Sequence, residues 1–246
     1  MTDKEKSKKF YITTAIDYVN GRSHIGHALE KIQADVLARF HRLNGEEVWF
    51  LTGTDEHGLK IFRAAEAAGK SAKDFVDENA ENFRKLKEIL NLSWNDFIRT
   101  SDEKRHWPGA QKLWSKLYAA GDLYKKKYQG LYCVGHEAFV TEKDLVDGKC
   151  PDHQKAPETI EQENWFFKLS RYQEEIKDAI ETDRLKIIPE SRKNEILSFI
   201  VSGLEDVSFS RPKKDLPWGI PVPHDPEQNM YVWCDALANY ITAIDY

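Results

Sequence analysis

Two histidines and a glycine near the start of the chain, in the run His24-Ile25-Gly26-His27, have the types and spacing of a phosphate-binding site. They fall where a polar loop is expected to turn into a helix, and a helix N-terminus offers free N–H groups and a partial positive charge that attract phosphate. The two imidazoles add donors on the same side, and Gly26 lets a flat ring approach the backbone. Alone, the four residues are also typical of two surface histidines that merely begin a helix.

The flanking elements favour the phosphate site. Residues 10–14 are rich in β-formers, and Asp17, Asn20 and Gly21 in the loop that follows are turn formers. Residues 48–51 form a second apolar run, so a parallel strand–helix–strand crossover is predicted, and ligands of such sheets bind at the carboxyl ends of the strands. The helix between the strands is predicted to end at Asn44-Gly45, because apolar residues recur every three or four positions before it: Ile25, Leu29, Ile32, Val36, Phe40 and Leu43.

The rest of the chain contains several predicted helices and one segment with a different sequence pattern. Helices are predicted over residues 61–68, 71–90, 101–120 and 189–202 and from residue 170, with capping boxes at Ser71 and Ser170. Between residues 123 and 169 the pattern changes to period-two alternation and short polar turns, which predicts an inserted, mainly β module. A proline-rich loop at 212–226 precedes a last predicted strand at 230–233.

Composition and charge restrict the class of protein. The 246 residues, 41% hydrophobic and 31% charged, suit one large globular domain or a domain with a sizeable insertion. No apolar run approaches the roughly 18 residues that cross a bilayer, and residues 1–9 lack a signal peptide's apolar core, so a cytoplasmic protein is expected. Three cysteines exclude a disulfide framework. A net charge of -5 argues against coating nucleic acid and leaves only local basic clusters, at 125–127 and 213–214, for such a partner.

Two cysteine–histidine pairs lie within the inserted segment, Cys133 with His136 and Cys150 with His153. In each pair two residues separate the cysteine from the histidine, and the two cysteines are 17 positions apart. Two thiolates and two imidazoles can close a tetrahedral structural zinc site. The pattern predicts a zinc knuckle, with a metal-free segment whose cysteines are simply buried as the alternative.

At this point the sequence resembles a known family. Residues 13–29, with the His-Ile-Gly-His run, and residues 51–58 are similar to the opening of the methionyl-tRNA synthetases, which are class I aminoacyl-tRNA synthetases. That family activates methionine with ATP and Mg2+ and then esterifies the aminoacyl group to the 3′ end of tRNA(Met). The similarity covers essentially the whole chain, continuing through residues 165–170, 208–212, 218–223 and 231–236.

The resemblance implies roles for particular residues. His24 and His27 match the histidines that bind the ATP phosphates and stabilise the transition state of adenylation, and Asn20 and Gly26 match further ATP-binding positions. Asp55 matches the aspartate that binds the ammonium group of methionine; its alternative role is a helix N-cap. The other residues that match the methionine pocket are Ile16, Tyr18, Trp233, Ala236, Leu237 and Tyr240.

Two positions depart from the family pattern. Some members carry proline in place of Leu237. Members commonly have Cys-x-x-Cys knuckles, whereas here His136 and His153 replace the second cysteine of each pair, and other members have lost the metal.

The resemblance implies an α/β fold: an incomplete Rossmann-type parallel sheet with an inserted, mainly β connective-peptide module. The first part of the catalytic domain would span residues 1–122, the insertion 123–169, and the return to the catalytic domain, with the methionine pocket, 170–246. The family's Lys-Met-Ser-Lys-Ser loop and anticodon-binding domain do not occur in the sequence, so we expect an N-terminal fragment with weak or no activity alone and the missing C-terminal half as its partner. Such a half-sheet should expose a strand edge and an apolar helix face.

Two other functions stay open at this stage. Another class I synthetase, or a nucleotidyltransferase with a His-x-Gly-His motif, would share the phosphate site and would prefer another amino acid in ATP–pyrophosphate exchange; the aromatic positions Trp233 and Tyr240 argue against it. A non-catalytic fragment would hold tRNA or a metal through the knuckle and the basic clusters. It would bind zinc and RNA but neither ATP nor methionine.

Overall fold

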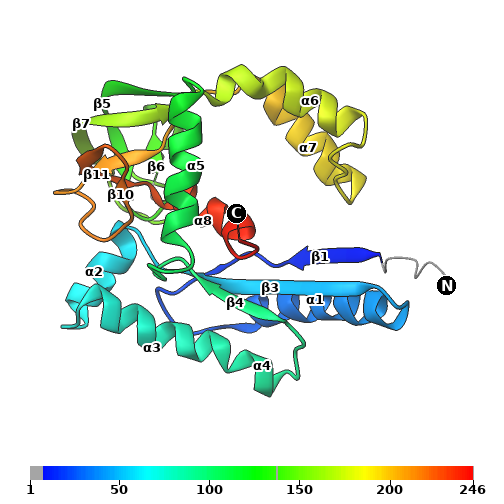
Figure 1. The fold of residues 1–246 in the computed structure, drawn as a ribbon. Coiled ribbons are helices and arrows are strands. Elements are labelled where there is room, and N and C mark those ends of the chain that lie inside the picture. Colours follow the sequence, from blue (N-terminus) through cyan, green and yellow to red (C-terminus); the bar gives the residue numbers. More distant parts are fainter. Residues whose placement is uncertain (1–7, 137, 246) are drawn as a thin grey trace.

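A parallel sheet carries the N-terminal part of the chain (Figure 1). The computed structural model describes residues 8–136 and 138–245, and the polar segment 1–7 lies outside them. Strand β3 (Glu47–Asp55) pairs in parallel with β1 (Lys9–Thr13), β2 (Asp17–Tyr18) and β4 (Asp96–Arg99). The two predicted strands are confirmed, and the second extends beyond Leu51 to place Asp55 at its carboxyl end.

Helix α1 (Ile25–Leu43) makes the predicted crossover from β1 to β3. It ends at Leu43 with Asn44 as its C-cap, and Gly45 continues at φ +80°, a conformation that glycine adopts without strain. The segment predicted as one helix at 71–90 is divided into α3 and α4, and Ser71 caps α3 by accepting a hydrogen bond from the Asp74 N–H. The three helices that follow β3 are α2 (Leu59–Ala67), α3 (Ala72–Arg84) and α4 (Leu86–Ile89).

The main core lies between β3 and the helices α1 to α4. Its large side chains, such as Phe50 of β3 and Phe83 of α3, are fully buried, and each stabilises the fold by about 2 kcal/mol through removal from water. The other buried side chains of this core come from segments that are far apart in the sequence: Val19, Ala34, Ala38, Val48, Ile61, Val76, Leu86, Leu92 and Trp94.

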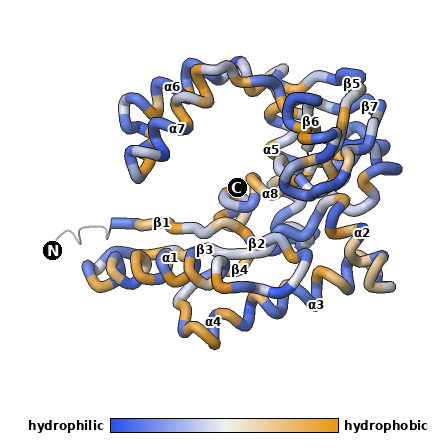
Figure 2. Tube along the Cα trace, turned by 180° about the vertical axis from the view of Figure 1, so that it is seen from behind, coloured by the Kyte–Doolittle hydropathy of each residue, from blue (hydrophilic) through white to orange (hydrophobic). Residues whose placement is uncertain are grey.

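The apolar stripe of α1 lies outside this core. Its six residues are all exposed, from 41% at Ile32 to 88% at Ile25, and the helix instead buries Lys31, Ala34, Asp35 and Ala38. Figure 2 shows apolar and polar residues alternating along α1. Within the described residues β1 is also an edge strand, paired only with β3. A strand edge and an apolar helix face are thus both exposed, as expected for a half-sheet.

Antiparallel sheets form the other half of the molecule. Helix α5 (Trp107–Ala119) leads into β5 (Leu123–Cys133), which pairs along its length with β7 (Glu158–Phe167). The predicted inserted segment is therefore β-rich. The remaining antiparallel strands are β6 (Ala138–Val140), β8 (Val207–Ser208), β9 (Ser210–Pro212), β10 (Pro221–Val222) and β11 (Asp225–Met230).

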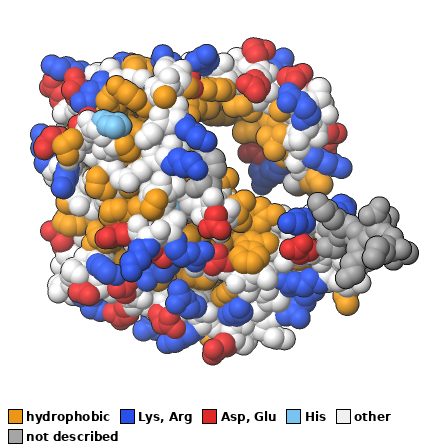
Figure 3. Space-filling model, in the orientation of Figure 1, with side chains coloured by type: hydrophobic (Ala, Val, Ile, Leu, Met, Phe, Trp, Pro, Cys, Tyr) orange, Lys and Arg blue, Asp and Glu red, His pale blue; other side chains and the backbone are white. Residues whose placement is uncertain are grey.

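A helical hairpin projects from this half. It consists of α6 (Gln173–Glu181) and α7 (Glu190–Val201) (Figure 1). Figure 3 shows a hollow between the hairpin and the sheet, with hydrophobic side chains along its rim. Within the described ranges, no helix is both long and apolar enough to cross a membrane.

Three sequence predictions are wrong in detail. Helix α5 begins at Trp107 rather than at residue 101, because the Asp102 carboxylate accepts hydrogen bonds from the backbone of Lys104 and Arg105 and holds a turn there. Ser170 forms no capping box, because its hydroxyl donates to Asp206 instead.

The third error concerns the segment predicted as a last strand at 230–233. Strand β11 ends at Met230, and helix α8 (Val232–Thr242) begins directly after Tyr231. Val232, Cys234, Ala236, Ala238 and Asn239 are buried on this helix, so its tertiary environment outweighs the β-forming tendency of the Tyr-Val-Trp run. The candidate pocket residues from position 233 onward therefore all lie on a helix.

We predict that Gly53→Ala lowers the free energy of unfolding by about 3 kcal/mol through overpacking. A Cβ at Gly53 would lie 2.2 Å from the Ile98 carbonyl oxygen on the neighbouring strand. Gly21→Ala is the matched control, since a Cβ there meets nothing within 4 Å. Thermal and urea unfolding measure the difference, and equal stability of the two variants would contradict the close approach of β3 and β4.

Candidate active site

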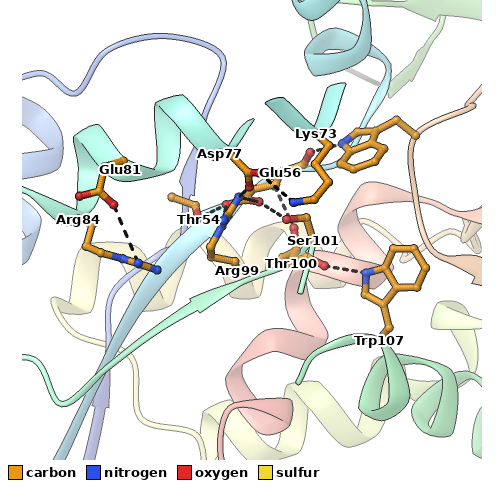
Figure 4. Close-up of polar contacts among 11 residues, drawn as sticks. Thr54, Glu56, Lys73, Asp77, Glu81, Arg84, Arg99, Thr100, Ser101 and Trp107 are labelled. Carbon is orange, nitrogen blue, oxygen red and sulfur yellow. Dashed lines mark hydrogen bonds and ion pairs between the residues drawn. The ribbon is translucent and has the colours of Figure 1, made fainter. Parts of the chain in front are cut away.

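The carboxyl end of β3 is fixed by a buried ionic network (Figure 4). Glu56, fully buried, accepts hydrogen bonds from Arg99 Nε at 2.7 Å and Arg99 Nη2 at 2.8 Å, and also from the Thr54 and Ser101 hydroxyls. Arg99 also binds Asp77 of α3. Every carboxylate oxygen of Glu56 therefore has partners, which offsets the cost of burying it. The network therefore ties the tip that carries Asp55 to β4 and α3.

His24 and His27 form the N-terminal cap of α1. His24 Nδ1 accepts from the Gly26 N–H at 3.2 Å, and His27 Nδ1 accepts from the His24 N–H at 3.1 Å. The rings stack with centroids 3.7 Å apart and are not buried. Since each Nδ1 uses its lone pair in the cap, these bonds assign the proton of each neutral ring to Nε2. The cap thus leaves two N–H donors beside the positive end of a helix.

A buried ion pair lies beneath His27. Lys31 of α1 is fully buried and pairs with Asp17 of β2, and His27 Nε2 lies 3.9 Å from the other Asp17 oxygen. Burial lowers the pKa of His27, against the opposing effect of Asp17, so its ring is neutral at pH 7. Burial likewise raises the pKa of Asp17, which Lys31 opposes. Sequence reasoning missed Lys31, because a lysine within a helix is usually solvated.

A cavity of about 340 Å³ opens beside the tip of β3. Strand β2 pairs with β3 there, with Tyr18 opposite Asp55, and α8 forms the facing wall. All seven residues that match the methionine pocket line this cavity: Ile16, Tyr18, Asp55, Trp233, Ala236, Leu237 and Tyr240. The remaining lining residues were not identified from the sequence as pocket residues: Ala15, Lys60, Gly135, His136 and Val232.

Asp55 does not have the alternative role of a helix cap. The N-cap of α2 is Gly58, and no side chain caps that helix. Asn20 is exposed in the loop between β2 and α1. The cavity therefore combines the Asp55 carboxylate with apolar and aromatic walls and with two further polar side chains, Lys60 and His136. The carboxylate suits a ligand with an ammonium group, and the walls suit an apolar or thioether side chain.

Helix α8 is held in place by a buried carboxylate. Asp235 is fully buried, and its two oxygens lie 2.5 Å from His57 Nδ1 and 2.7 Å from His106 Nε2. Burial would raise the pKa of Asp235, but the two imidazoles outweigh it and hold the pKa below its ordinary value. This group joins the cavity wall to the tip of β3 and the start of α5. Sequence reasoning missed it, because the partners are separated by 178 and 129 positions.

The two cysteine–histidine pairs meet in space. One ligand atom from each of Cys133, His136, Cys150 and His153 lies within 4.8 Å of the others. Both cysteines are buried and form no disulfide. Two thiols and two imidazoles at these separations fit the donor set and size of a tetrahedral zinc site, whose ligand bonds are about 2.0 to 2.3 Å long.

Comparison with known proteins identifies the family. The model of the family described as tRNA synthetases class I (M) matches residues 10–157 and 153–246. The chain belongs to the methionyl class I tRNA synthetases. Curated members of this family include the methionine–tRNA ligase of Brucella suis biovar 1, 49% identical over 97% of this chain, and that of Caldanaerobacter subterraneus subsp. tengcongensis, 48% identical over 97%.

Solved structures of the family show the same fold. The methionyl-tRNA synthetase of Mycobacterium tuberculosis bound by methionyl-adenylate superposes with a TM-score of 0.91 at 42% identity over 97% of this chain and 48% of its own. Its free form gives a TM-score of 0.79 at 39% identity, over 98% of this chain and 46% of its own. The α/β fold predicted from the resemblance is confirmed. The chain spans 47% of the Brucella relative and 37% of the Caldanaerobacter relative, so about half or less of their length.

We predict that Asp235→Asn lowers the free energy of unfolding by about 3 kcal/mol at pH 7, because it removes the charge that two buried imidazoles share. The lowered pKa of Asp235 means that its contribution is present above about pH 4 and is lost as the pH falls through the folded-state pKa. The variant should therefore lose less stability than the unsubstituted chain on acidification.

Urea unfolding at pH 7 and at pH 3.5 measures this difference. Glu103→Gln is the matched control, since this carboxylate is exposed just before α5. Equal pH dependence in Asp235→Asn and the unsubstituted chain would show that the carboxylate does not hold the helix.

Proposed function

We propose that this chain supplies the methionine-binding and ATP-phosphate-binding parts of a methionine–tRNA ligase. The observation that carries the proposal is the cavity beside Asp55, in which one carboxylate faces the aromatic rings of Tyr18, Trp233 and Tyr240. The M. tuberculosis synthetase that superposes best on this chain among those compared above is bound by methionyl-adenylate. Within this proposal, Asp55 binds the ammonium group of methionine, and the thioether lies against the rings.

The proposed chemistry needs no protein nucleophile. The methionine carboxylate attacks the α-phosphorus of ATP, which enters with Mg2+ as substrate, and pyrophosphate leaves. Negative charge grows on the phosphate oxygens during this step. In this proposal the Nε2–H groups of His24 and His27 and the N-terminus of α1 stabilise that charge, and Gly26 and Asn20 flank the nucleotide; the cap that leaves both Nε2 atoms as donors supports this.

The later transfer to tRNA(Met) belongs to the assembled enzyme in this proposal. Because the chain spans about half the length of its curated relatives, the C-terminal half of such a relative is the proposed partner. The knuckle is proposed to hold a structural zinc ion, which would stabilise the inserted module. A reducing cytoplasm, which keeps the free thiols available to a metal, is the compartment that this proposal requires.

Isothermal titration of this chain with methionine tests the proposal, because the seven residues that match the methionine pocket all line its cavity. We expect binding of one methionine per chain and weaker binding of leucine, which lacks the sulfur. Tighter binding of another amino acid would favour a different class I synthetase. Binding of zinc and RNA without methionine would favour a non-catalytic fragment.

We predict that Trp233→Ala raises the dissociation constant for methionine about 20-fold, because a large aromatic wall of the cavity is lost. Affinity for ATP should change far less. Trp49→Ala is the matched control, since Trp49 is a similarly exposed tryptophan on β3 outside the cavity. An equal loss of affinity for both substrates would count against the assignment of the pocket.

We predict that His24→Ala slows ATP–pyrophosphate exchange about 100-fold in the chain joined to the C-terminal half of the Brucella suis ligase, because a donor to the transition state is removed. Methionine affinity should stay unchanged. His24→Asn is the control for folding, since asparagine can cap the helix but lacks the imidazole. Normal exchange with weakened methionine binding would contradict the proposed role.

A further inference from the structure

The metal knuckle reaches the wall of the candidate methionine cavity. Gly135 and His136 belong to the first Cys-x-x-His pair, and both line the same cavity as Asp55 and Trp233. They are the only lining residues, within the described part of the chain, that come from the inserted module. One short segment therefore serves both the metal ligands and the cavity.

The position of this segment depends on the second pair. A Cβ added at Gly135 would lie 2.4 Å from the His153 imidazole, so the Gly135 backbone rests directly on that ring. The His136 and His153 rings meet edge to face, with centroids 4.5 Å apart. Any movement of His153 is consequently transmitted to the cavity wall.

His136 is oriented through both ring nitrogens. Its Nδ1 lies 3.7 Å from Cys150 Sγ, and its Nε2 lies 2.9 Å from the exposed carboxylate of Asp152. A carboxylate on the outer nitrogen is the usual partner of a metal-binding histidine. Besides the ring contact and the packing of Gly135 on His153, two thiol–imidazole contacts of 3.7 Å and this surface bond join the two pairs among the described residues. Such contacts are weak compared with coordination bonds.

We propose that a zinc ion at Cys133, His136, Cys150 and His153 sets the affinity of the chain for methionine, by holding Gly135 and His136 as an ordered wall of the cavity. This inference rests on the proposed function. Binding a ligand against a mobile wall costs conformational entropy, and a wall ordered in advance avoids that cost. Because coupling between two sites is reciprocal, methionine must strengthen zinc binding by the same factor.

The first test compares the zinc-loaded chain with the chain stripped by a chelator. Metal analysis should find one zinc ion per loaded chain, and isothermal titration should show a methionine dissociation constant about tenfold higher after stripping, which corresponds to about 1.4 kcal/mol. Methionine should also slow the transfer of zinc to a chromophoric chelator. Circular dichroism verifies that the stripped chain remains folded.

The second test substitutes Cys150, a proposed metal-ligating residue that does not line the cavity. Cys150→Ser should lose zinc and weaken methionine binding to the level of the stripped chain, whereas Lys149→Ala, an exposed neighbour, should change neither. Equal methionine affinity with and without zinc, or absence of stoichiometric zinc, would overturn the inference and leave the proposed function standing. Failure of the zinc-loaded chain to bind methionine at all would instead contradict the proposed function.

Discussion

The buried carboxylate of Asp235 is the interaction on which the candidate site depends. Its contacts join three elements: α8 carries the aspartate, while its two partners, His57 and His106, follow the tip of β3 and precede α5. Asp55 lies two positions before His57, and Trp233 lies two positions before Asp235. One fully buried contact therefore sets the distance between the acidic and the aromatic sides of the cavity. A buried charge with two imidazole partners tolerates little displacement, because any separation leaves it unpaired.

The paired histidines show how one local structure can serve folding and chemistry together. A helix that begins with histidine uses the ring nitrogen nearest the backbone as its cap, where serine or aspartate would use an oxygen. The cap consumes the Nδ1 lone pair of each ring, so both Nε2 atoms become donors, and in His27 the nearby Asp17 carboxylate favours the same tautomer. Burial beside the Asp17–Lys31 pair keeps His27 neutral, which preserves the cap at pH 7.

The local sequence pattern predicted those elements of the fold that interactions between near neighbours in sequence determine. The strands β1 and β3, the limits of α1 and the cap at Ser71 follow from spacing, turn formers and capping chemistry. The last strand at 230–233 was wrong, because the environment of α8 is set by segments more than a hundred positions away. The same reason hid the roles of His57 and His106, whose buried ionic partner is distant in sequence. Lys31 was missed because a lysine within a helix is usually solvated. The cavity residues were found through family resemblance, and spacing alone would have left each of them a core residue.

The apolar residues of α1 that are exposed are different from the residues that line the cavity. Within the described residues, the Asp55 carboxylate and three aromatic rings line the cavity, whereas six apolar side chains of α1 are exposed and β1 pairs only with β3. Patches of this kind are unfavourable in water and favour association. Relatives about twice as long have enough additional chain to cover them. Covering the stripe would stabilise α1, and therefore the histidine cap, without touching the amino-acid cavity. Assembly with a C-terminal half should for this reason affect the phosphate side of the site more than the methionine side.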